Sequence, residues 1–461
     1  MISEIVKKLK DKNIAILGFG LEGKSTYRFI RKYLGNVQLT IIDGKDKSTD
    51  EICKNDSNLD FIYGETYLDN LDKYDIIIKT PGISLKDINV DGIKDKITSQ
   101  LELLLEVNRK NIIGITGTKG KSTTSSLIYN VMKEQDIDVV LSGNIGVPVL
   151  DEIENYKEDT KIVIEMSSHQ LEFIKTSPHI AVILNLFQDH LDHAGTLEHY
   201  HNNKMNIFKY QTEDDIALYS IDNDYINQKM NEYDYKAVKY DISKDKEATS
   251  TNSIRIIKDS IYMSDKLLYV DGKRNLIGDH YLVDIAFVIT IAKLLDLNLD
   301  KAKETICNFE PLPYRLQKVG TFNDITYYVD TIATVPEATM AAVDSIDNID
   351  TLIFGGEDRH TDYSHFVEFL KRCSVKNLIC MYGTGSRIIK DLENCGKNIY
   401  YSDNMREAVS IAKKVTEPGT VCLLSPAASS KDFFIDYQEK GKLFVSLIKG
   451  EETDIVEKDK N

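Results

Sequence analysis

A glycine- and lysine-rich loop is the strongest chemical signal in the chain. Residues 116–123 read TGTKGKST, after an apolar, strand-like run and before a helix-like segment. Glycines in such a loop let backbone N–H groups close on phosphate oxygens, while Lys121 can meet the terminal phosphates and Ser122 can ligate Mg²⁺. Ile115 stands where the strict Walker pattern has its first glycine, so an ordinary strand–helix turn is the alternative. The residues expected to contact a nucleotide are Gly117, Thr118, Lys119, Gly120, Lys121, Ser122 and Thr123.

Two later segments place metal-binding side chains after predicted strands. Glu165 ends the apolar run 161–165, and residues 185–192 read NLFQDHLD, which includes His190. Because the carboxyl ends of parallel strands face the ligand crevice, a carboxylate there could hold Mg²⁺ beside the phosphate loop. Lys204 follows in a helix-like run. The alternatives are that Glu165 caps the next helix and that Lys204 faces solvent, as most helical lysines do.

A second glycine turn lies near the start of the chain. Gly18, Gly20 and Gly23 follow an apolar run in the spacing GxGxxG, and Asp43 ends the next predicted strand. This arrangement is typical of a dinucleotide-binding fold, although the motif alone is weak. Because hydride transfer has no use for a separate triphosphate loop, the turn could hold another phosphate-bearing ligand instead.

Composition narrows the class of protein. A net charge of −16 argues against a main task in neutralising nucleic-acid phosphate, so no nucleic-acid partner is expected. The six cysteines are scattered without a CxxC pair, which suits a reducing compartment. Neither the charged N-terminus nor the interrupted apolar stretch 282–297 is typical of a signal or a membrane span. We therefore expect a cytoplasmic protein without membrane insertion.

The alternation of strands and helices restarts twice along the 461 residues. It predicts an α/β fold of three domains, with boundaries near 98/99 and 309/310, the latter at the proline-rich FEPLP segment. The N-terminal and C-terminal domains are expected to be Rossmann-like, and the central domain to be a P-loop ATPase type with a mostly parallel sheet. Residues 249–273 are expected to add a small antiparallel layer, and the polar tail 451–461 is expected to fray.

Together these segments resemble the ATP-dependent Mur ligases over essentially the whole chain. The resemblance implies that Mg·ATP phosphorylates the carboxylate of UDP-N-acetylmuramoyl-L-alanine, that the amine of glutamate attacks the acyl phosphate, and that phosphate leaves. The SSHQLE stretch is similar to that of the glutamate-adding member of the family. The resemblance therefore implies a role in cytoplasmic peptidoglycan precursor synthesis. The matching segments are GTKGKST at 117–123, GNIG at 143–146, EMSSHQLE at 165–172, NLFQDHLDH at 185–193, Tyr314-Arg315, Asp330, GGEDR at 355–359 and LLSPAASSKDFFIDYQEKG at 423–441.

The resemblance also implies roles for single residues. Lys121, Glu165, His190 and Lys204 would be catalytic. Ser122 and Glu165 would hold one Mg²⁺, while His190 and a carbamylated, carboxylate-like Lys204 would hold a second. Further ATP contacts would be Asn144, Arg315 and Asp330. The UDP-substrate positions would be Gly18, Gly20, Leu21, Glu22, Gly23, Gly44 and Lys45, and the glutamate positions would be Thr334, Arg359, Ser430 and Tyr437.

Several positions depart from the family pattern. A lysine usual after the Asp330 position is Ile332, and the lysine of the glycine-rich 355–359 turn is Arg359. Two asparagines usual after the histidine near 280 are Tyr281 and Asp284, on the adenine side. These changes bear on the choice of D- or L-glutamate more than on the reaction. An L-glutamate-adding paralogue, a folate-type polyglutamate ligase and a P-loop ATPase switch are the alternatives, and a monomer is expected.

Overall fold

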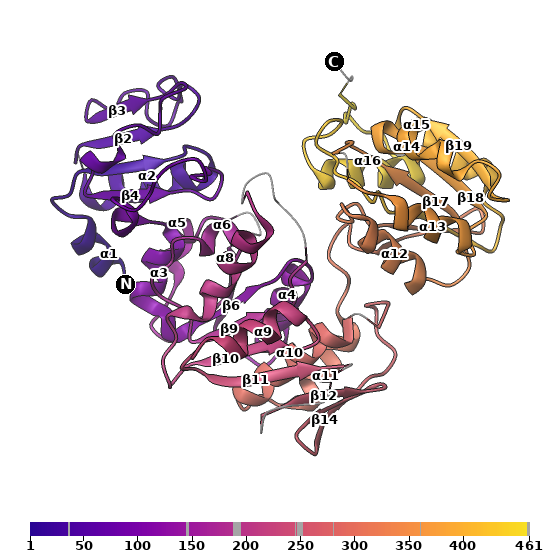
Figure 1. Cartoon of the computed structure of the whole chain (residues 1–461), viewed down its shortest axis with the longest axis horizontal. Helices are drawn as coiled ribbons and strands as arrows, with labels where there is room; N and C mark the ends of the chain where they lie inside the picture. The colour runs from indigo at the N-terminus through magenta and orange to yellow at the C-terminus, as the bar shows by residue number, and fades with distance from the viewer. Residues whose placement is uncertain are drawn as a thin grey trace. The chain divides into compact units, whose positions relative to one another are not determined.

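Three β-sheets, each with helices packed on it, form the framework of the protein (Figure 1). The computed structural model describes residues 1–35, 37–143, 147–187, 195–244, 246, 252–279, 281–359 and 361–458. The chain divides into two compact units: Met1–Gly272 with Leu282–Ile306, and Lys273–Tyr281 with Cys307–Asn461. The first unit holds two of the sheets and the second unit holds the third. The predicted three-domain boundaries stay a prediction.

The first sheet is fully parallel and has the order β3-β2-β1-β4-β5. The strand order reverses at β1, so the loop at its carboxyl end lies at a topological switch point, where α/β proteins bind ligands. All four residues of β1 are buried, as expected for a central parallel strand. The elements are α1 (Ile2–Leu9), β1 (Ile14–Leu17), α2 (Leu21–Leu34), β2 (Leu39–Ile42), β3 (Leu59–Ile62), β4 (Ile76–Lys79) and β5 (Ile97–Thr98).

The central sheet has the order β14-β13-β12-β11-β10-β9-β6-β8-β7. It is parallel from β7 to β12, and the expected antiparallel layer is present as β12, β13 and β14, which extend one edge of the same sheet. Its strands are β6 (Ile112–Thr116), β7 (Val139–Gly143), β8 (Lys161–Glu165), β9 (Ile180–Ile183), β10 (Ile216–Ser220), β11 (Val238–Ser243), β12 (Ile254–Ile257), β13 (Ser260–Met263) and β14 (Lys266–Val270). Its helices are α3 (Gln100–Asn108), α4 (Lys121–Lys133), α5 (Val149–Glu152), α6 (Ser168–Leu171), α8 (Leu197–Lys209), α9 (Asp224–Glu232), α10 (Tyr281–Leu294) and α11 (Leu299–Asn308).

The first two sheets share one apolar core, which explains why they form a single compact unit. Side chains of α2, α3 and α5 belong to the same buried cluster as residues of β1 and β8. The buried Gln100 amide reinforces this junction, because its Nε2 donates to Glu22 O and Thr26 Oγ1, both at 2.9 Å. Its Oε1 accepts from Leu150 N on α5 at 3.3 Å. A satisfied buried amide of this kind fixes the packing of its neighbours.

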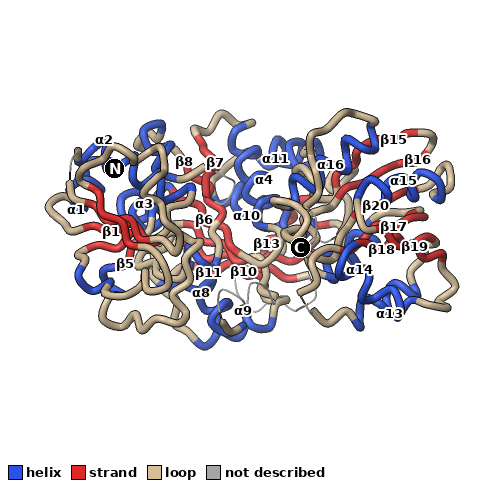
Figure 2. The backbone as a smooth tube through the Cα atoms, turned by 90° about the horizontal axis from the view of Figure 1, so that it is seen from above, coloured by secondary structure: helices blue, strands red, loops and turns tan. Residues whose placement is uncertain are grey.

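The third sheet has the order β15-β16-β20-β17-β18-β19 and is parallel except for the β15–β16 hairpin. Consecutive residues of β17 serve different cores, because Leu352 and Phe354 join one apolar cluster and Ile353 joins another. The sheet is therefore covered on both faces (Figure 2). The elements are β15 (Gln317–Phe322), β16 (Ile325–Val329), α12 (Pro336–Ser345), β17 (Ile349–Gly355), α13 (Ser364–Arg372), β18 (Asn377–Met381), α14 (Tyr382–Ile388), β19 (Asn398–Ser402), α15 (Met405–Val415), β20 (Val421–Leu424) and α16 (Tyr437–Lys449).

The predicted α/β class with mostly parallel sheets is confirmed. The six cysteines are all free thiols. No helix in the described ranges is long and apolar enough to cross a membrane. The expectation of a frayed tail is wrong for the part that is described, because Lys458 N donates to Phe433 O at 3.0 Å and Ile455 packs against the core of the second unit.

Candidate active site

The glycine-rich loop connects β6 to α4 and adopts a conformation that glycine favours. Gly117 has φ 152° and Gly120, the residue before α4, has φ 84°. A Cβ atom on Gly120 would lie 2.8 Å from Oδ1 of Asp284, so the close approach of α10 also requires glycine here. The loop therefore leads directly into the amino end of α4, the kind of helix end that binds phosphate in other proteins.

Asn185, the second residue after β9, clamps this loop from the neighbouring strand. Its backbone oxygen accepts from Thr118 N at 2.9 Å, and its Oδ1 accepts from Lys119 N at 2.8 Å. Its Nδ2 donates in return to Lys119 O at 3.1 Å. Asn185 lies in the segment predicted to carry the metal ligand His190, but its own role was not predicted. A polar amide directly beyond a strand that borders the loop was a usable signal.

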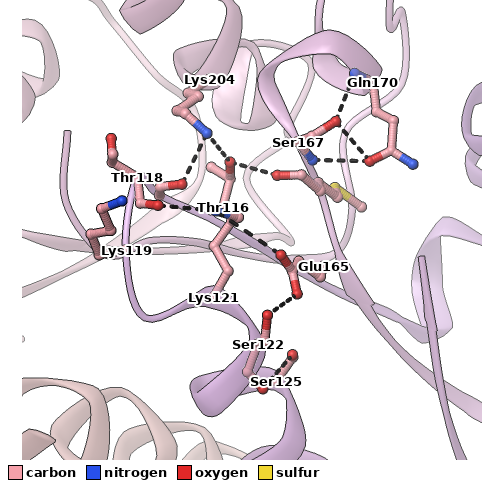
Figure 3. Close-up of polar contacts among 12 residues, drawn as sticks. Thr116, Thr118, Lys119, Lys121, Ser122, Ser125, Glu165, Ser167, Gln170 and Lys204 are labelled. Carbon is pink, nitrogen blue, oxygen red and sulfur yellow. Dashed lines mark hydrogen bonds and ion pairs between the residues drawn. The ribbon is translucent and has the colours of Figure 1, made fainter. Parts of the chain in front are cut away.

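Ser122, Glu165 and Lys121 form a polar cluster at the start of α4 (Figure 3). Ser122 Oγ donates to Glu165 Oε2 at 2.6 Å, and Lys121 Nζ lies 4.0 Å from Glu165 Oε1. Lys121 Nζ also donates to Thr118 O at 3.1 Å. Glu165 is 3% exposed and lies at the end of β8, which pairs with β6. A hydroxyl and a carboxylate this close are hard oxygen donors that suit Mg²⁺.

The capping alternative for Glu165 is wrong. Helix α6 is capped by Ser167, whose hydroxyl accepts from Gln170 N at 3.3 Å, while Gln170 Oε1 accepts from Ser167 N at 2.9 Å. This reciprocal capping box satisfies the helix end without Glu165. The carboxylate is left to face the phosphate loop.

Lys204 on α8 also points at the loop rather than at solvent (Figure 3). Its side chain is 2% exposed, and Nζ donates to Gly117 O at 2.9 Å and to Thr116 Oγ1 at 3.4 Å. The ring of Tyr200 lies 5.0 Å from Nζ. The solvent-facing alternative is therefore wrong. As an ammonium group Lys204 holds the loop and cannot ligate a cation, whereas a carbamate would supply oxygen donors.

Two predicted residues, His190 and Asn144, lie outside the described residues. Within the described ranges, no group of three or more His, Cys, Asp or Glu side chains could hold a metal ion. Ser122 and Glu165 are the predicted Mg²⁺ ligands that the structure brings together, and their two side-chain oxygens could hold one such ion.

Asp284 brings a carboxyl group to the back of the phosphate loop. The side chain is buried beside Gly120, and burial raises its pKa to about 8, although the nearby Thr124 hydroxyl opposes the shift. The carboxyl group is therefore largely protonated at neutral pH. In this state it resembles the asparagine that the family usually carries, because both are neutral and can donate one hydrogen bond.

The N-terminal glycine turn follows β1, at the switch point of the first sheet. Phe19 N donates to Asp43 Oδ2 at 2.8 Å and Lys45 N donates to Asp43 Oδ1 at 3.0 Å, so Asp43 ties the turn to the loop after β2. A Cβ on Gly18 would lie 2.1 Å from Thr80 Oγ1, and one on Gly23 would lie 2.1 Å from Gly18 O. The structure thus brings the predicted positions on these two loops to one edge of the sheet. They are Gly18, Gly20, Leu21, Glu22, Gly23, Gly44 and Lys45.

Glu22 differs from its neighbours in being largely enclosed. Gln170 Nε2 donates to Glu22 Oε1 at 3.4 Å, and burial raises the pKa of Glu22 to about 7 while the charge of Lys79 opposes the shift. Leu21 beside it is 60% exposed. The turn therefore offers one apolar side chain to a ligand and keeps its acidic side chain against α6.

In the second unit, the predicted ATP contact Asp330 and two of the predicted glutamate positions follow three adjacent strands. Asp330 follows β16, Arg359 follows β17 and Ser430 follows β20, and these strands are neighbours in the sheet. Arg359 Nε donates to Glu357 Oε2 at 2.8 Å and its NH2 donates to Ser429 Oγ at 3.0 Å. Since parallel strands end at one edge, these loops can form a single binding surface.

Ser430 and Asp330 contrast in how their polar atoms are used. Ser430 is 4% exposed, and its hydroxyl has no hydrogen-bond partner among the described residues. Asp330 accepts from Leu316 N and from Ser425 Oγ, both at 3.1 Å, and so anchors the residue after Arg315.

The two remaining predicted glutamate positions lie near helix starts. Thr334 lies in the turn before α12. Tyr437 is the first residue of α16, and its backbone oxygen accepts from Thr331 Oγ1 at 2.7 Å.

Comparisons with known proteins place the chain in one family. Residues 115–292 match the Mur ligase middle domain, and residues 314–428 match the Mur ligase, glutamate ligase domain. The UDP-N-acetylmuramoylalanine--D-glutamate ligase of Acetivibrio thermocellus is 31% identical to this chain, over 97% of this chain and 98% of the relative. The chain belongs to the Mur ligase family. A second Mur ligase of the same name, from Clostridium kluyveri, is 32% identical over 95% of this chain and 97% of its own.

Solved Mur ligases share the fold. The UDP-N-acetylmuramate-alanine ligase of Thermotoga maritima superimposes with a TM-score of 0.58 at 18% identity, over 95% of this chain and 99% of that chain. The MurF ligase of the same organism, in complex with ADP, gives a TM-score of 0.58 at 18% identity, over 90% of this chain and 96% of that chain. Identity this low supports the shared architecture of this Mur ligase and nothing finer.

Proposed function

We propose that this Mur ligase joins D-glutamate to UDP-N-acetylmuramoyl-L-alanine at the expense of ATP, in cytoplasmic peptidoglycan precursor synthesis. The near full-length relatives that carry this activity in their names support the substrates. The observation that carries the chemistry is the contact of Ser122 and Glu165 beside Lys121, directly at the start of α4. The products are ADP, phosphate and the new amide.

Phosphoryl transfer from ATP to a substrate carboxylate brings two anions together. Catalysis therefore depends on positioning and positive charge rather than on a nucleophilic side chain. Lys121 and the loop N–H groups provide this charge around the transferred phosphoryl group. Ser122 and Glu165 would hold Mg²⁺, which when bound neutralises charge on the phosphate oxygens. Asn144, Arg315 and Asp330 are proposed as further ATP contacts.

A second cation is proposed at His190 and Lys204. The neutral amine of Lys204 would add CO₂ to form a carbamate and release one proton, which turns a cation into an anionic oxygen ligand. Lys204 is buried beside the loop and not exposed to solvent, which is the position that such a ligand would need. Its present contact with Gly117 O places the Nζ atom at the loop itself.

The acceptor and the UDP-substrate are proposed to bind at the other two sheets. The guanidinium group of Arg359 would bind a carboxylate of D-glutamate. The Ser430 hydroxyl, which has no hydrogen-bond partner among the described residues, would form a further hydrogen bond to it. Thr334 and Tyr437 complete the proposed glutamate set. The N-terminus of α2, with Lys45 nearby, suits the diphosphate of the UDP-substrate. We further propose that the enzyme acts as a monomer.

The decisive experiment measures phosphate release and product mass with ATP, Mg²⁺ and UDP-N-acetylmuramoyl-L-alanine, in parallel with D-glutamate, L-glutamate and no amino acid. We expect an amide product only with D-glutamate. A product formed only with L-glutamate would overturn the stereochemistry and place the determinant in the second unit, where Ile332 and Arg359 depart from the family pattern. Phosphate release without any amide would favour the ATPase-switch alternative.

A further inference from the structure

The segment around Glu457 fills an anion-favouring site in the second unit. Its carboxylate accepts from Met405 N, with its two oxygens at 2.9 and 3.0 Å, and also from the hydroxyl of Tyr382. Met405 is the first residue of α15, an 11-residue helix, so the carboxylate lies at the positive end of the helix dipole. Three hydrogen bonds to one carboxylate are more than a frayed tail would make.

A buried lysine near Glu457 accounts for a negative charge at this position. Lys440 on α16 is fully buried, and its Nζ donates to Gly355 O at 2.8 Å and lies 5.2 Å from the ring of Tyr382. Burial lowers the pKa of Lys440 to about 7, and the charge of Glu457 opposes that shift. Glu457 therefore favours the charged form of a lysine that is fully buried.

The same tail also bonds to the loop between β20 and α16. Lys458 N donates to Phe433 O at 3.0 Å, and Lys458 Nζ donates to Phe434 O at 3.2 Å. The ring of Tyr382 stacks on Phe433 with 4.0 Å between centroids. Phe433 N and Phe434 N both donate to Ser430 O, at 3.1 and 2.9 Å. Contacts from the tail thus reach the turn that begins at Ser430.

Lys440 connects the contacts of the tail to the 355–359 turn, which also carries a predicted glutamate position. Its acceptor, Gly355, has φ 122° and opens the GGEDR turn that contains Arg359. A Cβ on Gly355 would lie 2.0 Å from Met381 O, so the turn is pressed against the strand that leads to Tyr382. One buried cluster therefore holds both the 355–359 turn and the 430–437 loop.

We propose that Glu457 and Lys458 are positioning residues for the acceptor amino acid: they hold the 430–437 loop and the 355–359 turn in the geometry that binds D-glutamate. Neither residue is proposed to touch the substrate. The inference rests on the proposed function, because it concerns the same glutamate site. Its distinctive consequence is a defect confined to the amino acid, since the phosphate loop and the UDP-substrate positions lie in the other unit.

The kinetic test compares Glu457→Ala and Lys458→Ala with the unaltered enzyme. We expect KM for D-glutamate to rise about tenfold in Glu457→Ala, with KM for ATP and for the UDP-substrate within about twofold. Glu457→Gln keeps an acceptor oxygen but loses the charge, so an intermediate rise is expected. Glu452→Gln, an exposed residue of the same tail, is the matched control and should change nothing. An unchanged KM for D-glutamate, or an equal rise for all three substrates, would overturn the proposal.

Hydrogen exchange tests the positioning role without any turnover. In Glu457→Ala, amides of residues 430–437 and 355–359 should exchange about tenfold faster, while those of residues 112–133 around the phosphate loop should not change. Uniformly faster exchange, or no change in either loop, would overturn the proposal. If the unaltered enzyme made no D-glutamate amide, only the proposed function would fail, because this readout still decides whether the tail orders the two loops.

Discussion

The phosphate loop and the glutamate-side loops, residues 355–359 and 430–437, differ in how many of their polar groups already have partners within the protein. Around the phosphate loop the reactive groups are already bonded to one another, as in Ser122 with Glu165 and Lys204 with Gly117 O. Around the glutamate side, Ser430 keeps a buried hydroxyl with no partner among the described residues, and Arg359 shares its guanidinium group with Glu357. A ligand at the phosphate loop would have to replace hydrogen bonds that already exist within the protein. A ligand on the glutamate side could bond to the Ser430 hydroxyl without replacing one.

The difference has an energetic consequence. Removing one member of a bonded, buried group leaves its partner charged and unsatisfied, so such changes cost much more than the bond itself. Removing a group that has no protein partner costs the folded state little. Substitutions at the phosphate loop should therefore damage activity severely, and those on the glutamate side should change amino-acid affinity by smaller, separable amounts.

The largest effect is expected for Lys121→Ala. Loss of the ammonium group that lies 4.0 Å from Glu165 should lower kcat about a thousandfold, because this charge is proposed to stabilise the transferred phosphoryl group. Steady-state assays of ATP-dependent amide formation measure it. Lys133→Ala, at the exposed end of the same helix, is the control. Activity within tenfold of the unaltered enzyme would remove Lys121 from the reaction.

Lys204→Ala should lower kcat about a hundredfold, because it removes both a buried bond to the loop and the proposed metal ligand. If the residue acts as a carbamate, added acetate or bicarbonate should restore part of the rate in the alanine variant. Lys204→Arg keeps a cation at the loop but cannot form the carbamate, so it should stay inactive. An active arginine variant would show that the positive charge alone suffices and would end the carbamate proposal.

The phosphate loop was predictable because its parts are contiguous or lie on adjacent strands. The run from Thr116 to Ser122 is one strand–loop–helix segment, and Glu165 reaches it because β8 pairs with β6. Sequence spacing alone predicts such contacts once parallel strands are assumed. The bonds of Asn185 were missed, since a lone asparagine after a strand has no distinctive spacing.

The anchoring of the tail could not be read from the sequence. It depends on Lys440 being buried and on Tyr382 and Met405 lying together, and these residues are brought together only by the third sheet. A polar, charged segment is normally solvated, and no periodicity distinguishes Glu457 from Glu451 or Glu452. Tertiary context decided the outcome.

Arg359→Ala sharpens the comparison on the glutamate side. We expect KM for D-glutamate to rise about thirtyfold with kcat changed less, because the guanidinium group is proposed to bind the substrate carboxylate in the ground and transition states alike. Glu357→Gln is the partner variant. It frees Arg359 from a competing carboxylate and should lower the same KM, whereas a rise would show that Glu357 orients the guanidinium group for binding.

Asp284→Asn tests the buried carboxyl group beside the phosphate loop. Burial raises the pKa of Asp284 to about 8, whereas an aspartate in the unfolded chain keeps its ordinary value of about 4. Between these values the folded protein keeps a proton that the unfolded chain loses. Stability contributed at this site therefore falls as pH rises from about 4 to 8. The asparagine variant avoids this cost and should be more stable than the unaltered protein, with a larger gain at pH 8 than at pH 5. Thermal unfolding at the two pH values measures it, and a gain independent of pH would exclude the titration of Asp284 as the cause.

The smallest effect is expected for Ser430→Ala, and it separates the two regions most cleanly. Because the hydroxyl has no partner among the described residues, its removal should leave the free energy of unfolding within about 0.5 kcal/mol. If the hydroxyl instead binds D-glutamate, KM for D-glutamate should rise about fivefold. Ser122→Ala, which breaks a bonded pair, should change kcat instead. A loss of stability in Ser430→Ala without a change in KM would mean that the hydroxyl serves the fold, and the glutamate side would then be as fully bonded as the phosphate loop.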